Sequence, residues 1–388
     1  MAIRTIAVVG TGLIGTSIAL AASRRGVTVF LSDQDPMAAR TAAALGAGRA
    51  GPPAGPVDLA VLAVPPSDVG TVLAELQGRE FAHSYTDAAS VKSGPETEAL
   101  RHAPHPSRYV GGHPLAGRER RGPLAARADL FQGRSWVLTP SPVTSSAALD
   151  RARELVALCG ANPVVTQSRA HDEAVALTSH VPHLVASLMA ARLQEGPDGM
   201  SRFAGQGLRD VTRIAGGASG LWGDILQANA ASVVGVMKDL HADLSRLVSA
   251  LDVLAEPDAG ERTPAMRTLV DLLDRGIAGL AELPPVRLDA SADGLQVRVA
   301  VTNRPGELSR LLDAVAGFGV TAEDATVEDA AAPWGDGLTV RFGATPYVTD
   351  LADRMVAELV AQGWDAVRQK GAQADWREEG PAFPAIRT

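Results

Sequence analysis

IRTIAVVGTGLIGTSIALAASRRG, residues 3–26, is the stretch that decides the fold of the first part of the chain. It opens with a short apolar run typical of a buried strand and closes with a segment of helical apolar spacing. Between the two lies Gly10-Thr-Gly12-Leu-Ile-Gly15. A strand, this glycine spacing and a helix together predict the first turn of a Rossmann-type dinucleotide-binding domain.

Each glycine has its own expected task at this turn. Gly10 allows the tight turn, Gly12 lets a pyrophosphate approach the backbone, and Gly15 lets the helix pack on the strand. The helix N-terminus carries free N–H groups and a partial positive charge. We therefore expect Leu13 and Ile14, which open the helix, to lie against the cofactor as well.

The identity of the cofactor depends on the end of the next predicted strand, residues 27–32. Asp33 follows that strand, at about the distance from the glycines where an acid binds the ribose hydroxyls of NAD. Gln34 and the next few residues offer no arginine for a 2′-phosphate, so the sequence favours NAD over NADP. The alternative is that Asp33 only caps the turn leading to Asp35.

Further apolar runs alternate with helical stretches up to residue 167 and predict a doubly wound, mostly parallel sheet. We expect strands at residues 59–64, 84–86, 109–111, 136–138 and 163–166. Ligands bind beyond the carboxyl ends of such strands. Val64 and Pro65 are expected beside the nicotinamide, and the segments DAASVK (87–92) and GGHPLAG (111–117) bring Ser90 and His113 to the same edge. We predict His113 as the catalytic base; a structural loop histidine is the alternative.

Residues 168–284 have helical periodicity almost throughout and predict an all-α domain. In RAHDEAVALTSHVPHLVA (169–186), His180 and His183 stand three residues apart, so they share a helix face and can reach one cavity. Pro182 predicts a kink between them. In GLRDVTRIAGGASGLW (207–222), Asp210 can hold the guanidinium of Arg213. We expect no metal site, because no carboxylate completes a set with the histidines.

The last part of the chain predicts a separate module at residues 293–371, after a proline-bearing linker. Strand and helix patterns follow in the order βαββαβ, which is ferredoxin-like. The turn Asn303-Arg-Pro305-Gly306-Glu-Leu308 opens the first helix of this module. Free N–H groups at that helix start beside Asn303 suit an amino acid's carboxylate. Residues 372–388 are expected to be a tail.

Composition narrows the classes of function. With 44 acidic and 36 basic residues the net charge is −8, which argues against a general nucleic-acid or membrane-surface role. The single Cys159 excludes a disulfide framework within the chain. We see neither a signal peptide nor an apolar run of membrane-spanning length, and we expect a cytoplasmic protein.

Two multi-residue motifs in the helical part carry a family resemblance. HDxxxAxxSHxPHLxA (171–186), followed by LRDxTRIA (208–215) and Trp222, resembles the prephenate/arogenate dehydrogenase family. DAASVK and HPLAGRE (113–119) are similar to further motifs of that family, and the strand–NRPGEL–helix start resembles an ACT domain. The resemblance covers nearly the whole chain.

The resemblance implies roles for individual residues. It implies that His113 interacts with the ring hydroxyl of the substrate and that Ser90 bridges substrate and cofactor. It implies that His183 and Arg213, with His180 nearby, contact the carboxylates or carbonyl of the substrate. Arg118 departs from the family pattern, which leaves the role of Glu119 open.

The expected function is NAD-dependent oxidative decarboxylation of prephenate toward tyrosine by a homodimer, with tyrosine as an effector at the ACT-like module. Arogenate is the alternative substrate, and a 4-amino-4-deoxyprephenate dehydrogenase of a specialised pathway is another. A β-hydroxyacid dehydrogenase would need a lysine on the first interdomain helix, and residues 168–196 contain none. A non-catalytic amino-acid sensor is the alternative from a different class.

Overall fold

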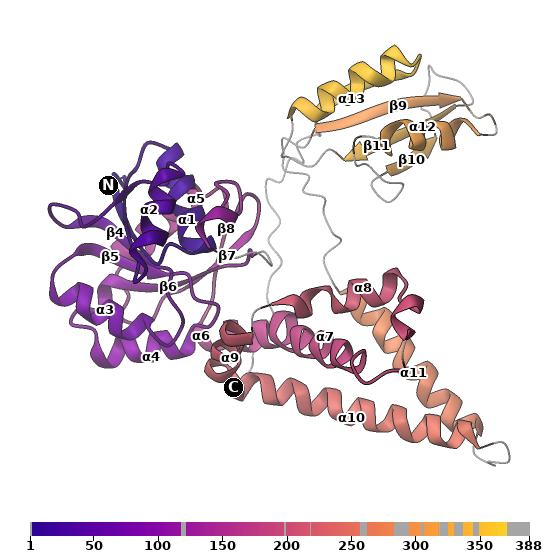
Figure 1. Cartoon of the computed structure of the whole chain (residues 1–388), viewed down its shortest axis with the longest axis horizontal. Helices are drawn as coiled ribbons and strands as arrows, with labels where there is room; N and C mark the ends of the chain where they lie inside the picture. Colours follow the sequence, from indigo (N-terminus) through magenta and orange to yellow (C-terminus); the bar gives the residue numbers. More distant parts are fainter. Residues whose placement is uncertain are drawn as a thin grey trace, which may run out of the picture. The chain divides into compact units, whose positions relative to one another are not determined.

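The computed structural model is shown in Figure 1. It describes residues 2–117, 122–197, 199–217, 219–256, 262–282, 295–302, 304, 306–316, 318, 325–329, 337–343 and 349–370. The chain divides into two units, each with most of its contacts within itself: residues 1–269 and residues 270–388.

The first unit begins with an eight-stranded sheet of order β3-β2-β1-β4-β5-β6-β7-β8. Its strands are β1 Thr5–Val9, β2 Thr28–Ser32, β3 Arg49–Ala50, β4 Val57–Leu62, β5 Ala82–Asp87, β6 Tyr109–Pro114, β7 Ser135–Thr139 and β8 Asn162–Val165. Neighbouring strands are parallel apart from the antiparallel pair β6–β7. The predicted Rossmann-type, mostly parallel sheet is confirmed. Strand β3 was not predicted, because it lies in a loop rich in glycine and proline.

Helices cover both faces of this sheet. They are α1 Leu13–Arg24, α2 Pro36–Ala44, α3 Val69–Gly78, α4 Ser93–His102 and α5 Ser146–Leu158, with short 3-10 turns at Pro106–Arg108 and Pro123–Ala125. Successive residues of β1 enter two different cores, since Ile6 and Val8 pack with α1 and α5 whereas Ala7 packs with α3 and α4. Alternate residues of a strand point to opposite faces, so a strand buried on both sides reads as continuously apolar. Figure 1 shows the two helix layers on either side of the sheet.

A helical segment follows within the first unit. It consists of α6 Ser168–Val175, a π-helical turn η3 Ala176–His180, α7 Val181–Arg192, η4 Met200–Phe203, α8 Gln206–Thr212, η5 Arg213–Gly216, α9 Ser219–Ala228, α10 Ala230–Ala255 and α11 Arg262–Ala281. Helix α11 crosses the division at residue 269. Each of these elements is helical, as the sequence predicted for this segment.

Two details of the helical segment differ from the sequence predictions. The sequence predicted a kink at Pro182, but Pro182 lies in the first turn of α7. The irregularity in the helix is the π-helical turn before it, which inserts one extra residue. The helical periodicity of this part did not predict the break at Asn229, which separates α9 from α10. The side chain of Asn229 bonds elsewhere, as described below.

The stretch Ser168–Arg192 is long and apolar enough to cross a membrane by length and composition, with a mean hydropathy of 1.4. The expectation that no apolar run has this length was therefore wrong. The stretch also carries His171, Asp172 and His180, whose side chains are buried and hydrogen-bonded inside the folded unit. A core helix of a soluble protein can be equally long and apolar. Buried polar side chains with hydrogen-bond partners, such as His171, Asp172 and His180, are typical of a core helix.

The second unit contains a four-stranded antiparallel sheet of order β10-β11-β9-β12. Its elements are β9 Leu295–Thr302, α12 Glu307–Ala316, β10 Ala325–Asp329, β11 Gly337–Gly343, α13 Thr349–Ala361 and β12 Asp365–Lys370, which is the predicted order βαββαβ. Val297, Val299 and Leu311 are among the residues of its core. Gly306 has φ 88°, a conformation that favours glycine at this turn. Asn303, Pro305, the linker and the predicted tail lie outside the described residues.

Candidate active site

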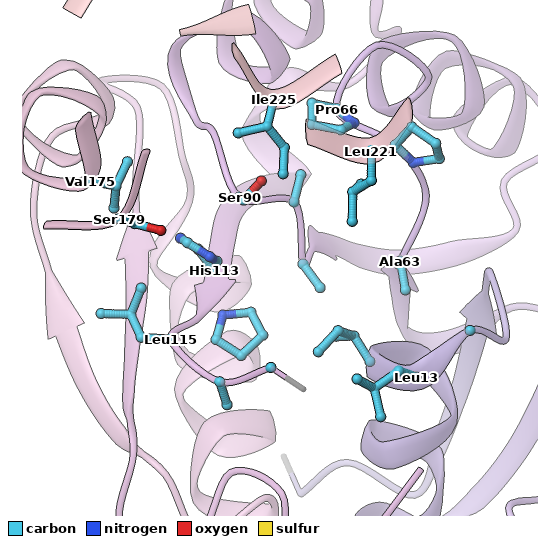
Figure 2. A pocket seen from close by; sticks show the side chains of 18 of the residues that line it. Leu13, Ala63, Pro66, Ser90, His113, Leu115, Val175, Ser179, Leu221 and Ile225 are labelled. Carbon is cyan, nitrogen blue, oxygen red and sulfur yellow. The ribbon is translucent and has the colours of Figure 1, made fainter. Parts of the chain in front are cut away.

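One pocket of about 780 Å³ lies at the carboxyl ends of the parallel strands, within the first unit. Its volume is in the range of small-molecule and cofactor sites. The wall combines the glycine turn, the segments after β4, β5 and β6, and the helical elements α6, η3 and α9. Predicted residues on this wall are Gly12, Leu13, Ile14, Gly15, Val64, Pro65, Ser90, His113 and His180. Figure 2 shows Ser90 and His113 facing the same cavity as Leu13 and Ala63.

The glycine turn has the geometry expected for a cofactor. Gly10 has φ 94°, and a Cβ there would stand 2.3 Å from the carbonyl oxygen of Ala63. A Cβ on Gly15 would stand 1.9 Å from the carbonyl oxygen of Gly10, so these two positions exclude a side chain for reasons of packing. A Cβ on Gly12 would meet nothing within 4 Å. The space beside Gly12 is open toward the pocket, which fits a pyrophosphate close to the backbone.

Asp33 lies at the carboxyl end of β2, next to the glycine turn. Its Oδ2 accepts hydrogen bonds from the backbone N–H of Thr11 at 2.5 Å and from the Thr11 hydroxyl at 3.0 Å. Its Oδ1 accepts from the backbone N–H of Asp35 at 2.9 Å. The carboxylate therefore both caps a turn and stands fixed beside the cofactor turn, although it is not part of the pocket wall.

A buried ion pair holds the two segments that carry Ser90 and His113. Lys92 and Asp87 are in direct contact with side chains fully excluded from solvent. The Lys92 ammonium also donates to the carbonyl oxygen of Gly112 at 2.6 Å, and the Tyr109 hydroxyl donates to Asp87 at 2.6 Å. Because Gly112 directly precedes His113, this pair fixes the backbone that presents the predicted base.

His113 is hydrogen-bonded to a second histidine that we did not predict as a functional residue. His113 Nδ1 lies 2.8 Å from Nε2 of His171, and His171 Nδ1 lies 2.8 Å from Oδ1 of Asp172. Asp172 also accepts from the backbone N–H groups of Lys92 and Ser93, both at 2.8 Å. The adjacent letters His-Asp at the start of the 171–186 motif are the signal that could have identified this pair.

The electrostatics of this group favour a neutral base. Burial lowers the pKa of His113 well below its ordinary value, and the charges of His171, Lys92 and His180 act in the same direction, against a smaller opposing effect of Asp172. Burial alone would raise the pKa of Asp172, but hydrogen bonds from His171 and Ser93 and from the Lys92 backbone lower it overall. His113 is thus suited to accept a proton and Asp172 to stay ionised.

His180 and His183 have different surroundings, although they stand three residues apart. His180 lines the pocket, and burial lowers its pKa to about 4. The ring of His183 stacks on Trp222, with centroids 3.6 Å apart and an angle of 12° between the planes. Burial also lowers the pKa of His183. Of the two imidazoles predicted to reach one cavity, that of His180 lines the pocket. Among the described residues of the pocket wall, Trp222 is present and His183 is not.

Arg213 begins the 3-10 turn η5 and its side chain is exposed. Asp210 is exposed as well and accepts a hydrogen bond from the Gln206 amide at 2.8 Å. Neither residue belongs to the described pocket wall, and the expectation that Asp210 holds the guanidinium of Arg213 stays a prediction. The substrate-binding roles of Arg213 and His183 stay predictions. Arg118 and Glu119 lie outside the described residues.

No group of three or more His, Cys, Asp or Glu side chains is arranged to hold a metal ion in the part of the chain that the structure describes. Cys159 is buried, and burial raises the pKa of its thiol to about 12.

Known proteins similar to this chain identify its family. A family model described as "Prephenate dehydrogenase, nucleotide-binding domain" matches residues 18–165, and "Prephenate dehydrogenase, dimerization domain" matches residues 167–262. The probable prephenate dehydrogenase NovF of Streptomyces niveus is 42% identical over 365 residues, covering 94% of this chain and 99% of its own length. The chain belongs to the prephenate dehydrogenase family.

Other members of the prephenate dehydrogenase family are more distant. The cyclohexadienyl dehydrogenase of Zymomonas mobilis is 31% identical, with 63% of this chain and 88% of its own length covered. Among solved structures, prephenate dehydrogenase from A. aeolicus, in complex with hydroxyphenyl propionate and NAD+, has a TM-score of 0.63 and 24% identity. The match covers 73% of this chain and 99% of that one, and it supports the same fold.

Proposed function

We propose that this protein catalyses the NAD-dependent oxidative decarboxylation of prephenate to 4-hydroxyphenylpyruvate. The observation that carries the proposal is the pocket itself, in which His113 and Ser90 face the same space as the glycine turn. Membership of the family supports it, as do the names of the relatives from Streptomyces niveus and Zymomonas mobilis. The NAD+ of the A. aeolicus complex supports the choice of cofactor.

The pocket wall, together with Asp33 beside the glycine turn, fits the parts of that cofactor. The open space beside Gly12 suits the pyrophosphate, Val64 and Pro65 suit the nicotinamide side, and Asp33 suits the ribose hydroxyls. NAD, when bound, accepts the hydride from the ring carbon that bears the hydroxyl. We expect NAD to support turnover about tenfold better than NADP or more, because a repulsion of about 1.4 kcal/mol between Asp33 and a 2′-phosphate is enough for that ratio.

His113 is the base in the proposed mechanism. Its imidazole takes the proton of the ring hydroxyl as the hydride leaves, and Ser90, on the same pocket wall, holds that hydroxyl. The bond between the ring and the carboxylate then breaks, and carbon dioxide departs. The electron pair of that bond completes the aromatic ring, and the ring oxygen takes the proton back from His113. General-base assistance typically contributes about 10²- to 10⁴-fold, and aromatisation supplies most of the driving force.

The test is NADH formation, followed by absorbance, with prephenate and then with arogenate as substrate. The His113→Asn variant should fold and bind NAD but lose about 10²- to 10⁴-fold in kcat. A variant with near-normal kcat would remove His113 from the mechanism. If arogenate is the better substrate the protein is an arogenate dehydrogenase, and turnover of 4-amino-4-deoxyprephenate alone would place it in a specialised pathway.

We further propose that the βαββαβ module of the second unit is an ACT-like regulatory domain that binds tyrosine near its first turn. The element order and the helix start at Glu307 support this. Tyrosine should then lower activity, and removing residues 290–388 should leave an active enzyme that ignores tyrosine. Tyrosine binding without any dehydrogenase activity would support the sensor alternative instead.

We also propose a homodimer. The matched dimerization-domain model supports this, and so does an exposed apolar stripe on α10 formed by Leu240, Leu244, Val248 and Leu251. These residues recur every three or four positions and so lie on one face of the helix. We place the enzyme in the cytoplasm, in keeping with an acidic chain that uses NAD and carries one buried cysteine.

A further inference from the structure

Asp172 is the centre of a buried hydrogen-bond network that reaches the pocket. It is 2% exposed and, with its lowered pKa, ionised, so its carboxylate oxygens can only accept hydrogen bonds. The 2.8 Å contact between Oδ1 of Asp172 and Nδ1 of His171 therefore requires the proton of His171 to be on Nδ1. With one proton on its ring, His171 then has an unprotonated Nε2.

The tautomer of His113 follows from that of His171. The 2.8 Å contact between His113 Nδ1 and His171 Nε2 needs one donor, and His171 Nε2 has no proton to give. His113 must therefore donate from Nδ1, which leaves Nε2 as the unprotonated nitrogen available to a ligand in the pocket. The buried ammonium of Lys92 nearby disfavours a positive charge on His113.

The tautomer of His180 follows from Asn229. The side-chain amide of Asn229 lies 2.8 Å from the backbone carbonyl oxygen of Asp172, which can only accept, so the amide nitrogen faces it. The same nitrogen lies 3.1 Å from Nδ1 of His180. His180 therefore accepts at Nδ1, and its proton is on Nε2. This also explains the break between α9 and α10, because Asn229 is held by these two bonds.

We propose that His171, Asp172 and Asn229 are positioning residues that set opposite tautomers on two histidines of the pocket. His113 then presents an acceptor nitrogen and His180 a donor N–H. This inference rests on the proposed dehydrogenase function, in which the ring hydroxyl needs an acceptor and a substrate carboxylate or carbonyl oxygen needs a donor. When His113 Nε2 takes the hydroxyl proton, the electron pair of the O–H bond stays on oxygen. The positive charge on His113 is then stabilised through His171 by Asp172.

The first test reads the tautomers without substrate. Nitrogen-15 NMR of the full chain labelled at histidine distinguishes protonated from unprotonated ring nitrogens, and single histidine variants assign the signals. The proton should be on Nδ1 in His113 and on Nε2 in His180, at a pH above the ordinary histidine pKa of about 6.5. A proton on Nε2 of His113 in the wild-type protein would overturn the proposal.

The second test separates positioning from packing at residue 171. His171→Leu removes the acceptor for His113 and should lower kcat by about 10- to 100-fold, the usual cost of losing such a partner in metal sites, with KM little changed. His171→Gln can place an amide oxygen near the position of Nε2 and should recover most of kcat. His102→Leu, on the exposed side of α4, is the matched control and should change neither constant. A His171→Gln variant as defective as His171→Leu, at equal melting temperature, would contradict the proposal.

The third test uses Asn229→Asp, which keeps the shape of the side chain but cannot donate to Asp172 or to His180. His180 should move its proton to Nδ1, and KM should rise by about tenfold, the equivalent of about 1.4 kcal/mol, with a smaller effect on kcat. An unchanged KM with an unchanged His180 tautomer would overturn this part. If wild-type protein oxidises none of the proposed substrates while His113 carries its proton on Nδ1, the proposed function fails and the tautomer assignment stands.

Discussion

Replacing Lys92 by methionine breaks the buried ion pair with Asp87 and changes the length of the side chain little. Both side chains are fully excluded from solvent. Removing one partner of a buried pair leaves an uncompensated charge and typically costs about 3–5 kcal/mol. For a unit of this size, about 1 kcal/mol shifts the melting temperature by about 2–4 °C. Lys92→Met should therefore lower the melting temperature of the first unit by about 6–20 °C.

Two further variants make this prediction specific. Arg169→Met removes an ion pair with Glu173 of 2.9 Å whose side chains are 88% and 56% exposed, and such a pair contributes about 0.5 kcal/mol or less. Its melting temperature should stay within about 2 °C of wild type. The double variant Lys92→Met with Asp87→Asn removes both charges and should be more stable than Lys92→Met alone.

The assay is thermal unfolding followed by circular dichroism, at a pH where both residues are charged in the wild-type protein. A shift for Lys92→Met no larger than that for Arg169→Met would refute the argument that burial makes the pair essential. In the fraction that stays folded, kcat should fall as well, because Lys92 also bonds the carbonyl of Gly112, next to His113. Normal kcat would show that this bond does not position the base.

Three other predictions concern the cofactor turn, the base and the interface. Gly12→Ala should leave the melting temperature unchanged but weaken NAD binding measured by calorimetry. Gly15→Ala should lower the melting temperature, because only the Cβ at position 15 meets protein atoms. Equal changes in melting temperature for the two variants would contradict this geometry. Since the base acts when neutral and its pKa is lowered, kcat/KM should fall on the acid side with a midpoint below about 6.5, and a midpoint above that value would exclude His113 in this environment. If the proposed homodimer forms, Leu244→Glu should convert it to a monomer by light scattering, and an unchanged dimer mass would place the interface away from α10.

The sequence allowed the Rossmann-type sheet and much of the pocket to be predicted because both depend on local patterns. The glycine turn and Ser90 each follow a strand, His113 lies near the end of strand β6, and parallel strands bring their carboxyl ends to one edge. The roles of His171 and Asp172 were not predictable in this way. Their contacts with His113 and Lys92 join residues 58 and 80 positions apart and exist only once α6 packs on the sheet domain.

The other differences also have a non-local cause. The helix break at Asn229 comes from a side chain that bonds Asp172 and His180, partners 57 and 49 positions away. Periodicity alone made Asp210 and Arg213 a pair on one face, but it did not show that this face is exposed. Spacing tells which residues share a face, whereas burial depends on what packs against that face.

The π-helical turn at Ala176–His180 has a consequence for insertions and deletions in this segment. A π turn holds one residue more than an α turn, so it is equivalent to a one-residue insertion into a regular helix. Deleting one residue between positions 176 and 180 would restore the regular helix and rotate all of α7 by about 100° relative to α6. Leu184 and Val185 would leave their core, and His183 would leave the face of Trp222. Substitutions at single positions are local here, but a change of length would alter the register of every residue from His180 to Arg192.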